Sequence, residues 1–192
     1  MASGELPLVF ERNDGQLDPA VRFLARGAGY QVFFTDDGAT WALQTADPAA
    51  AEVVRMRLIG ARAAAGVTGV APQPARAHYF SGRRRAAWRT NVPTFGRVHH
   101  SQVYRGIDLH YYGREGALEY DFVVAPGVDP AVISLGFEGA RRMTIDGAGD
   151  LVLETRGGRL VQRRPVAYQQ VSGERRIVES RYVLAEGRTV GF

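Results

Sequence analysis

The residues best suited to chemistry lie in one predicted β-hairpin. Four titratable side chains alternate there with apolar ones, namely Asp108 and His110, then Glu119 and Asp121. Successive side chains of a strand point to opposite faces, so these four share a face with Tyr112. Carboxylates beside a histidine can bind a cation or perform general acid–base catalysis. We therefore take this face as a candidate ligand or cation face, without assigning a catalytic residue or a particular metal.

Two strands, residues 107–112 and 117–124, must position this face. They are joined by a turn at 113–116 that contains two glycines. The opposite face carries large apolar side chains: Ile107, Leu109, Tyr111, Leu118, Tyr120, Phe122 and Val124. A one-residue shift in strand register would bury the carboxylates and expose these apolar groups, so the pattern predicts which face is exposed to solvent.

Two interpretations of the polar face remain open. Like charges opposed on a ladder are destabilising, so arginine, protonated His110 or a metal must lie nearby. The face is then either a solvated surface whose acids pair with arginines, or a site. Calcium is possible there but unsupported, and no cofactor is predicted. Residues 36–38 and 146–150 are predicted to be hairpin turns, because the EF-hand pattern with its terminal Glu is missing.

Other candidate chemistry is weaker. His99, His100 and Ser101 with Asp108 superficially suggest a catalytic triad, but adjacent histidines point in different directions and no G-x-S-x-G turn is present. Aromatic residues in strands usually belong to the core. Tyr112 is the exception, since alternation places it outside, where it can stack on a sugar.

Composition excludes several classes of protein. The chain has no cysteine, which excludes thiol catalysis and cysteine-ligated metals. Its formal net charge is +4, but every basic residue is arginine and these are scattered along the sequence. Nucleic-acid binding needs basic residues gathered on one face, so we predict no nucleic-acid partner.

The ends of the chain suggest an excised domain. No apolar run approaches the roughly 18 residues that span a bilayer, so the protein is predicted not to be transmembrane. Residues 1–5 lack the pattern of a signal peptide and are interpreted as a cloning remnant. Residues 6–192 are predicted to form a single domain. The chain ends at Phe192, within or at the start of a predicted strand, so we expect it to be truncated before further domains.

Short strands separated by glycine turns dominate the rest of the chain. Expected strands include 6–10, 21–25, 30–35, 39–45, 53–59, 78–80, 95–98, 132–137, 143–145, 151–155, 160–162, 166–170 and 177–184. Residues 11–16 are expected to turn. Residues 61–69 are expected to be a weak helix or, because Pro72 and Pro74 follow, a loop. The pattern predicts an all-β, mostly antiparallel, sandwich-like domain of two packed sheets with little helix.

Several ordered motifs carry a family resemblance. They are Phe10-Glu11-Arg12-Asn13-Asp14-Gly15-Gln16, residues 21–27, Trp88-Arg89-Thr90-Asn91-Val92-Pro93, residues 104–109 and residues 118–122. They resemble the N-terminal domain of unknown function of bacterial SBBP-repeat (β-propeller repeat) proteins. The resemblance implies a secreted or cell-surface protein in which repeat domains of the same polypeptide follow this one. It supplies no catalytic residues.

Three functions are therefore carried forward. The first is a non-catalytic structural, adhesion or recognition module at the N-terminus of an extracellular multidomain bacterial protein, with repeat domains, surface glycans or proteins as partners. The second is a carbohydrate-binding module. The third is a hydrolase that uses Asp108, His110, Glu119 and Asp121.

Overall fold

The fold is all-β and mainly antiparallel, as the sequence predicts. The computed structural model describes residues 8–44, 52–62, 66–185 and 189–192; it is 62% strand and 3% helix. The cloning remnant expected at residues 1–5 lies outside the described residues. Within the described part of the chain, no helix is long and apolar enough to cross a membrane.

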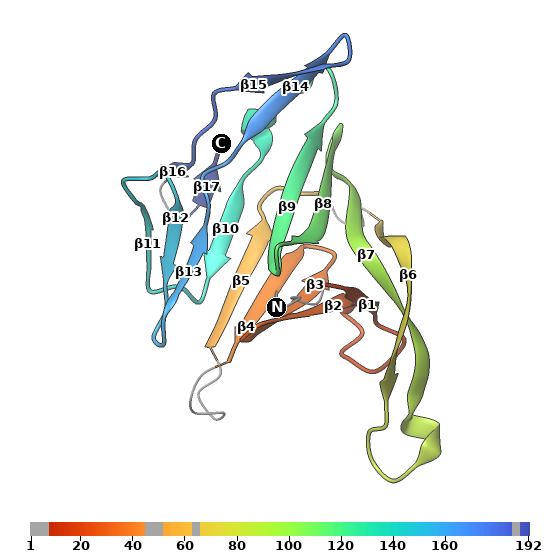
Figure 1. Ribbon diagram of the computed structural model, residues 1–192. Coiled ribbons are helices and arrows are strands. Elements are labelled where there is room, and N and C mark those ends of the chain that lie inside the picture. Colours follow the sequence, from red (N-terminus) through yellow and green to blue (C-terminus); the bar gives the residue numbers. More distant parts are fainter. Residues whose placement is uncertain (1–7, 45–51, 63–65, 186–188) are drawn as a thin grey trace, which may run out of the picture.

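One large sheet organises the molecule (Figure 1). In the described residues it has 12 strands. Its order is β16 (Val183–Ala185), β17 (Thr189–Gly191), β10 (Leu135–Glu138), β5 (Glu52–Leu58), β4 (Gly38–Leu43), β3 (Tyr30–Thr35), β2 (Val21–Gly27), β1 (Phe10–Arg12), β7 (Arg89–Tyr104), β8 (Ile107–Arg114) and β9 (Ala117–Val124), with β6 (Val67–Tyr79) paired to β7.

The 16-residue strand β7 divides this sheet into two leaves. β6 pairs with one edge of β7 from Val67 to Tyr79. The other edge of β7 pairs first with β1, at Thr94 and Phe95, and then with β8, from Arg97 onward. Since β1 and β8 share one edge, the β1–β5 leaf and the β8–β9 leaf separate beyond β7. The expected two packed sheets are thus two leaves of one sheet.

The core lies between the leaves. Phe34 on β3 packs edge-on against Tyr111 on β8, with ring centroids 4.8 Å apart, and its ring lies 5.4 Å from that of Phe10 on β1. All three side chains are fully buried. Contacts between strands far apart in the sequence therefore hold β8 in place, and β8 positions the polar face.

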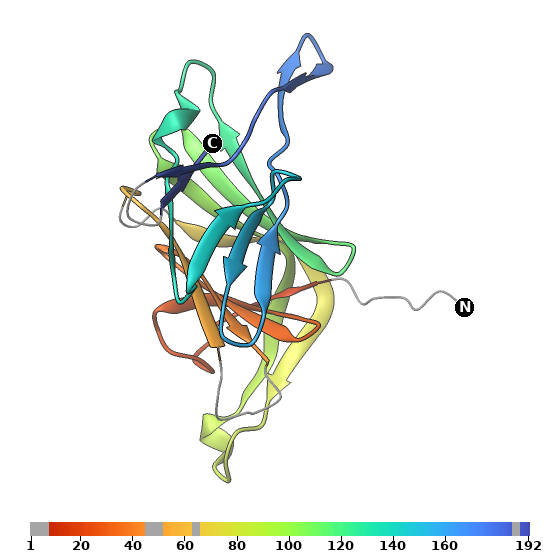
Figure 2. The same cartoon turned by 90° about the vertical axis from the view of Figure 1, so that its left-hand side faces the viewer.

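Two small sheets complete the structure. β11 (Arg142–Ile145), β12 (Leu151–Glu154) and β13 (Arg159–Gln162) form a three-stranded sheet that buries Leu151 and Leu153 (Figure 2). The Tyr120 hydroxyl of β9 donates to Gln162 Oε1 at 2.8 Å, which ties this sheet to the large one. β14 (Ala167–Val171) and β15 (Glu174–Val178) form a separate two-stranded ribbon.

The weak helix or loop expected at residues 61–69 is wrong from Val67 onward, where β6 begins. Pro72 lies within this strand, opposite Phe95. Among the described strands β6 pairs with β7 alone, so proline is tolerated because its missing N–H removes no ladder bond to a second neighbour. Ala71 has a φ of 57°, and the register shifts between Pro72 and Arg76, which marks an irregular edge strand.

Other boundaries also differ from expectation. β1 includes Glu11, which was expected to turn, because it pairs with Leu24 on one side and Thr94 on the other. The strand expected at 132–137 begins only at Leu135, after a 3₁₀ turn over Pro130–Val132. The strand expected at 177–184 is two strands, β15 and β16, in different sheets.

Candidate functional site

The predicted hairpin is confirmed. Ile107, Leu109 and Tyr111 are fully buried, and the intervening side chains of β8 point outward and are half-buried. The turn is tighter than expected: only Glu115 and Gly116 separate β8 from β9, with φ of 50° and 73°. Two central residues with positive φ are typical of a type I′ hairpin, whose twist matches that of the strands. This turn sets the register of the polar face.

That register arranges the outer side chains in cross-strand rows. One row is His99 on β7, His110 on β8 and Asp121 on β9; the next is Arg97, Tyr112 and Glu119. Asp108 lies opposite Val123. Asp108 and Glu119 are thus in rows four residues apart along β8. The register thus pairs Glu119 with Tyr112 rather than with an acid or His110.

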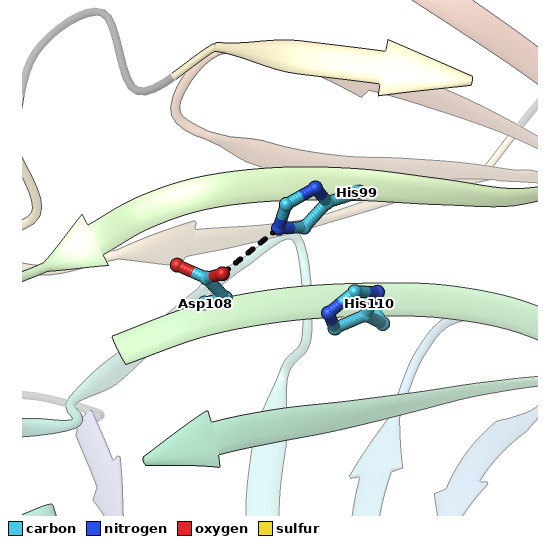
Figure 3. Close-up of side chains that lie close together, drawn as sticks. All are labelled: His99, Asp108 and His110. Carbon is cyan, nitrogen blue, oxygen red and sulfur yellow. Dashed lines mark hydrogen bonds and ion pairs between the residues drawn. The ribbon is translucent and has the colours of Figure 1, made fainter. Parts of the chain in front are cut away.

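His99 is the residue that the prediction missed. Its ring stacks on that of His110, with centroids 4.4 Å apart and an interplanar angle of 6°. His99 Nε2 lies 3.0 Å from Asp108 Oδ2 (Figure 3). His99 lies outside the predicted hairpin, and it joins the site only because β7 pairs with β8. Ser101, considered as its triad partner, donates its hydroxyl to the carbonyl of Gly66 at 3.3 Å.

A β-bulge in β7 holds Asp108. The ladder with β8 is interrupted between His100 and Tyr104, and Gln102 there has a φ of 51°. The Gln102 backbone N–H donates to Asp108 Oδ1 at 2.7 Å, and its side-chain Nε2 donates to the same oxygen at 3.3 Å. Gln102 Oε1 accepts from the Gly106 N–H at 3.0 Å. Asp108 Oδ1 is thereby occupied, and Oδ2 faces His99.

The surroundings set the charge of each group. Partial burial acts to raise the pKa of Asp108, but the Gln102 N–H and His99 outweigh it, so the net pKa is lowered and Asp108 is ionised at neutral pH. Partial burial lowers the pKa of His110, and His99 adds to this effect against the opposing pull of Asp108. His110 is therefore neutral at pH 7, with a ring lone pair available.

Tyr112 is engaged on both its ring and its hydroxyl. The hydroxyl donates to Asp121 Oδ2 at 3.0 Å, and the Arg97 guanidinium lies 5.6 Å from the ring centroid. Burial raises the pKa of Tyr112, and the charge of Asp121 raises it further, so the phenol stays protonated. Tyr111, expected on the apolar face, is buried, and so is Trp41 on β4.

Three side chains of the face can hold a metal. His99, Asp108 and His110 each offer one ligand atom, and these atoms all lie within 4.8 Å of one another. Two imidazoles and a carboxylate suit transition metals rather than calcium, which prefers oxygen ligands. The residues expected to turn at 146–150 do so without needing an ion: Asp146 Oδ1 accepts from the N–H groups of Ala148 and Asp150.

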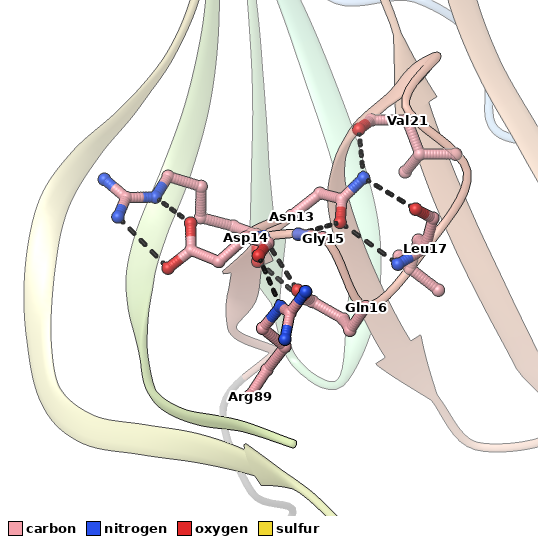
Figure 4. Close-up of polar contacts among 8 residues, drawn as sticks. Asn13, Asp14, Gly15, Gln16, Leu17, Val21 and Arg89 are labelled. Carbon is pink, nitrogen blue, oxygen red and sulfur yellow. Dashed lines mark hydrogen bonds and ion pairs between the residues drawn. The ribbon is translucent and has the colours of Figure 1, made fainter. Parts of the chain in front are cut away.

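The loop after β1 is a second polar cluster, and its bonds organise its own backbone (Figure 4). The Asn13 side-chain amide donates to the carbonyls of Asp18 and Val21 at 2.9 and 2.8 Å, and its Oδ1 accepts from the N–H groups of Gly15 and Leu17 at 3.0 and 3.1 Å. The Asn13 side chain therefore makes hydrogen bonds to the loop backbone in place of the strand pairing that the loop lacks.

The loop also joins two of the motif stretches. Arg89 Nε donates to the Asp14 carbonyl at 3.0 Å, and the Arg89 guanidinium packs against Gly15. A hollow of about 400 Å³ lies beside the loop, lined in part by Arg12, Asn13 and Leu17. The polar groups of the residue 10–16 motif therefore stabilise the loop after β1, which is a structural role.

The fold and the site together define an all-β domain with a polar face on strands β7, β8 and β9. A family model matches residues 10–192, so the chain belongs to the family described as domain of unknown function DUF7948. A search of the curated proteins found no match, and a search of the solved structures found none. The predicted membership of a family of unknown function is confirmed.

Proposed function

We propose that this domain is a non-catalytic module of an extracellular bacterial protein, and that the β14–β15 ribbon is its contact with an adjoining domain. The observation that carries this proposal is an exposed apolar surface on an isolated hairpin. Val166, Tyr168 and Ile177 expose 66%, 46% and 70% of their surface. The ribbon projects from the end of the molecule in both views (Figures 1 and 2).

The exposed residues form one face. Tyr168 lies directly opposite Ile177 in the ladder, and Gln170 opposite Arg175. Val166 is two residues before Tyr168, so alternation places it on the same side. The Arg175 guanidinium carbon lies 3.5 Å from the Tyr168 ring centroid. An isolated two-stranded hairpin is marginally stable in water, and clustered exposed apolar residues are typical of interaction surfaces.

The partner and location follow from the resemblance described above. It implies SBBP-type repeat domains in the same polypeptide, and such a neighbour lies at a high effective concentration. Burying Ile177 and Tyr168 against it would stabilise both surfaces. Placement at the cell surface or outside the cell is likewise part of this proposal.

The two other functions gain less support. Sugar stacking on Tyr112 would have to displace Arg97 from its ring and compete with Asp121 for its hydroxyl. A glycoside hydrolase that works through two carboxyl groups needs them to converge on one bond, whereas the register places Asp108 and Glu119 in separate rows.

Hydrogen exchange tests the proposal. The β14–β15 amides should exchange fast in this domain alone and at least tenfold more slowly in the longer protein. Ile177→Glu should restore fast exchange in the longer protein. Val161→Glu is the matched control, because Val161 is a half-exposed valine on β13 rather than on the ribbon. Equal exchange of the ribbon amides in both proteins would contradict the proposal.

A further inference from the structure

The outer face of β7 and β8 brings together two imidazoles and one carboxylate from neighbouring strands. His99 and His110 are directly opposite in the ladder, and Asp108 is two residues before His110 on the same face. Their ligand atoms all lie within 4.8 Å of one another. Figure 3 shows the His99 ring directed toward Asp108, with His110 beside it.

The carboxylate is held in place through one oxygen by Gln102, and its other oxygen contacts His99. Asp108 Oδ1 accepts from both the backbone N–H and the side-chain amide of Gln102. Asp108 Oδ2 is directed to His99 Nε2 at 3.0 Å. Hydrogen bonds that orient a ligating carboxylate are a regular feature of metal sites, because they fix the ligand before the ion arrives.

The three groups are accessible to an ion in solution. The side chains of His99 and Asp108 keep 23% and 30% of their surface exposed. The imidazoles stack flat against each other across the ladder, so the two rings must tilt out of this stack before their nitrogen lone pairs point to one ion. Ligands about 2.1 Å from a tetrahedral ion lie about 3.4 Å apart. The His99–Asp108 separation is already this short, and the remaining separations must close by at most about 1.4 Å.

We propose that His99, Asp108 and His110 form a binding site for a divalent transition-metal ion, with Zn²⁺ as the best-suited ion. Two imidazole nitrogens and one carboxylate oxygen are a donor set that zinc sites use, whereas Ca²⁺ and Mg²⁺ take oxygen ligands. Three protein ligands leave at least one coordination position facing solvent. A water molecule, or a donor group of a molecule that contacts this face, completes the site.

Titration calorimetry tests this site with Zn²⁺ alone. Protein without a histidine tag is stripped with EDTA and titrated with Zn²⁺ and, separately, with Ca²⁺. We expect one Zn²⁺ per chain and no comparable Ca²⁺ binding. His99→Gln, His110→Gln and Asp108→Asn should each weaken Zn²⁺ binding at least tenfold. His78→Gln is the matched control, since His78 is exposed at the far end of β6, and it should bind Zn²⁺ like the unaltered protein.

An NMR titration of the unaltered protein tests the site without relying on the folding of any variant. Zn²⁺ should shift the NMR signals of the His99 and His110 ring protons and leave those of the buried His100 and of His78 in place. Failure of Zn²⁺ to bind, unweakened binding by the His99→Gln and His110→Gln variants, or shifts at His78 instead would each overturn the site. In the last two cases the pairing of His99 with Asp108 is purely structural.

Discussion

His100 makes the stability of this domain depend on pH. Its ring is fully buried on the inner face of β7, packed edge-on against Tyr111 at 5.5 Å between centroids. Neither ring nitrogen has a hydrogen-bond partner among the described residues. Burial lowers the pKa of His100 from 6.5 to about 4, because the charged imidazolium is poorly solvated there. The folded protein therefore holds this ring neutral where the unfolded chain protonates it.

The sign and size of the effect follow from this difference. Between pH 6.5 and about 4 the unfolded state binds a proton at His100 that the folded state does not, so stability falls as the pH falls through this window. Below about pH 4 both states are protonated and this loss stops growing. Each pKa unit corresponds to about 1.4 kcal/mol, so the full loss is about 3 kcal/mol. That is a large share of a typical total stability of about 5–15 kcal/mol.

Urea denaturation of the unaltered protein and of His100→Leu, from pH 7 down to pH 4, measures this effect. Leucine has a similar volume and no polar atom, so the variant should be about as stable at pH 7, or slightly more so, since two unpaired buried nitrogens are removed. Between pH 7 and 4 the unaltered protein should lose about 3 kcal/mol more than the variant. Carboxylates and the other histidines titrate in both proteins and cancel. Parallel pH profiles would refute the reasoning.

Three further changes test the packing. Gly113→Ala should cost about 1–3 kcal/mol in urea denaturation, because its new Cβ would lie 2.5 Å from Leu8 Cβ, whereas Gly147→Ala, with no atom within 4 Å, should be near neutral. Asn13→Ala should lower the free energy of unfolding by about 2 kcal/mol or more, since it removes the bonds that hold its loop; a change under about 0.5 kcal/mol would contradict this role. Tyr120→Ala should cost about 3 kcal/mol, measured in the same way, because its ring contacts Tyr111 and Phe122.

Much of the fold could be predicted because it depends on patterns between residues that are close in the sequence. Alternation along 107–124 predicted the buried face of β8, and the glycines predicted most turns of the second half of the chain. Prediction failed where a strand's neighbours decide its structure. β6 contains Pro72 and reads as a loop, yet it forms a strand because β7 offers a long edge and no second strand must pair with it.

The candidate site, too, could be predicted only in part from the sequence. The sequence by itself determined that Asp108, His110, Tyr112, Glu119 and Asp121 share an outer face, because a strand's period of two is a property of the backbone. Only the tertiary structure decided which of them meet. The two-residue turn placed Glu119 opposite Tyr112, and the pairing of β7 with β8 brought His99 onto His110 and Asp108. Both pairings join consecutive strands, and the alternation left their register open because the register is fixed by the length of each turn and by the bulge at Gln102.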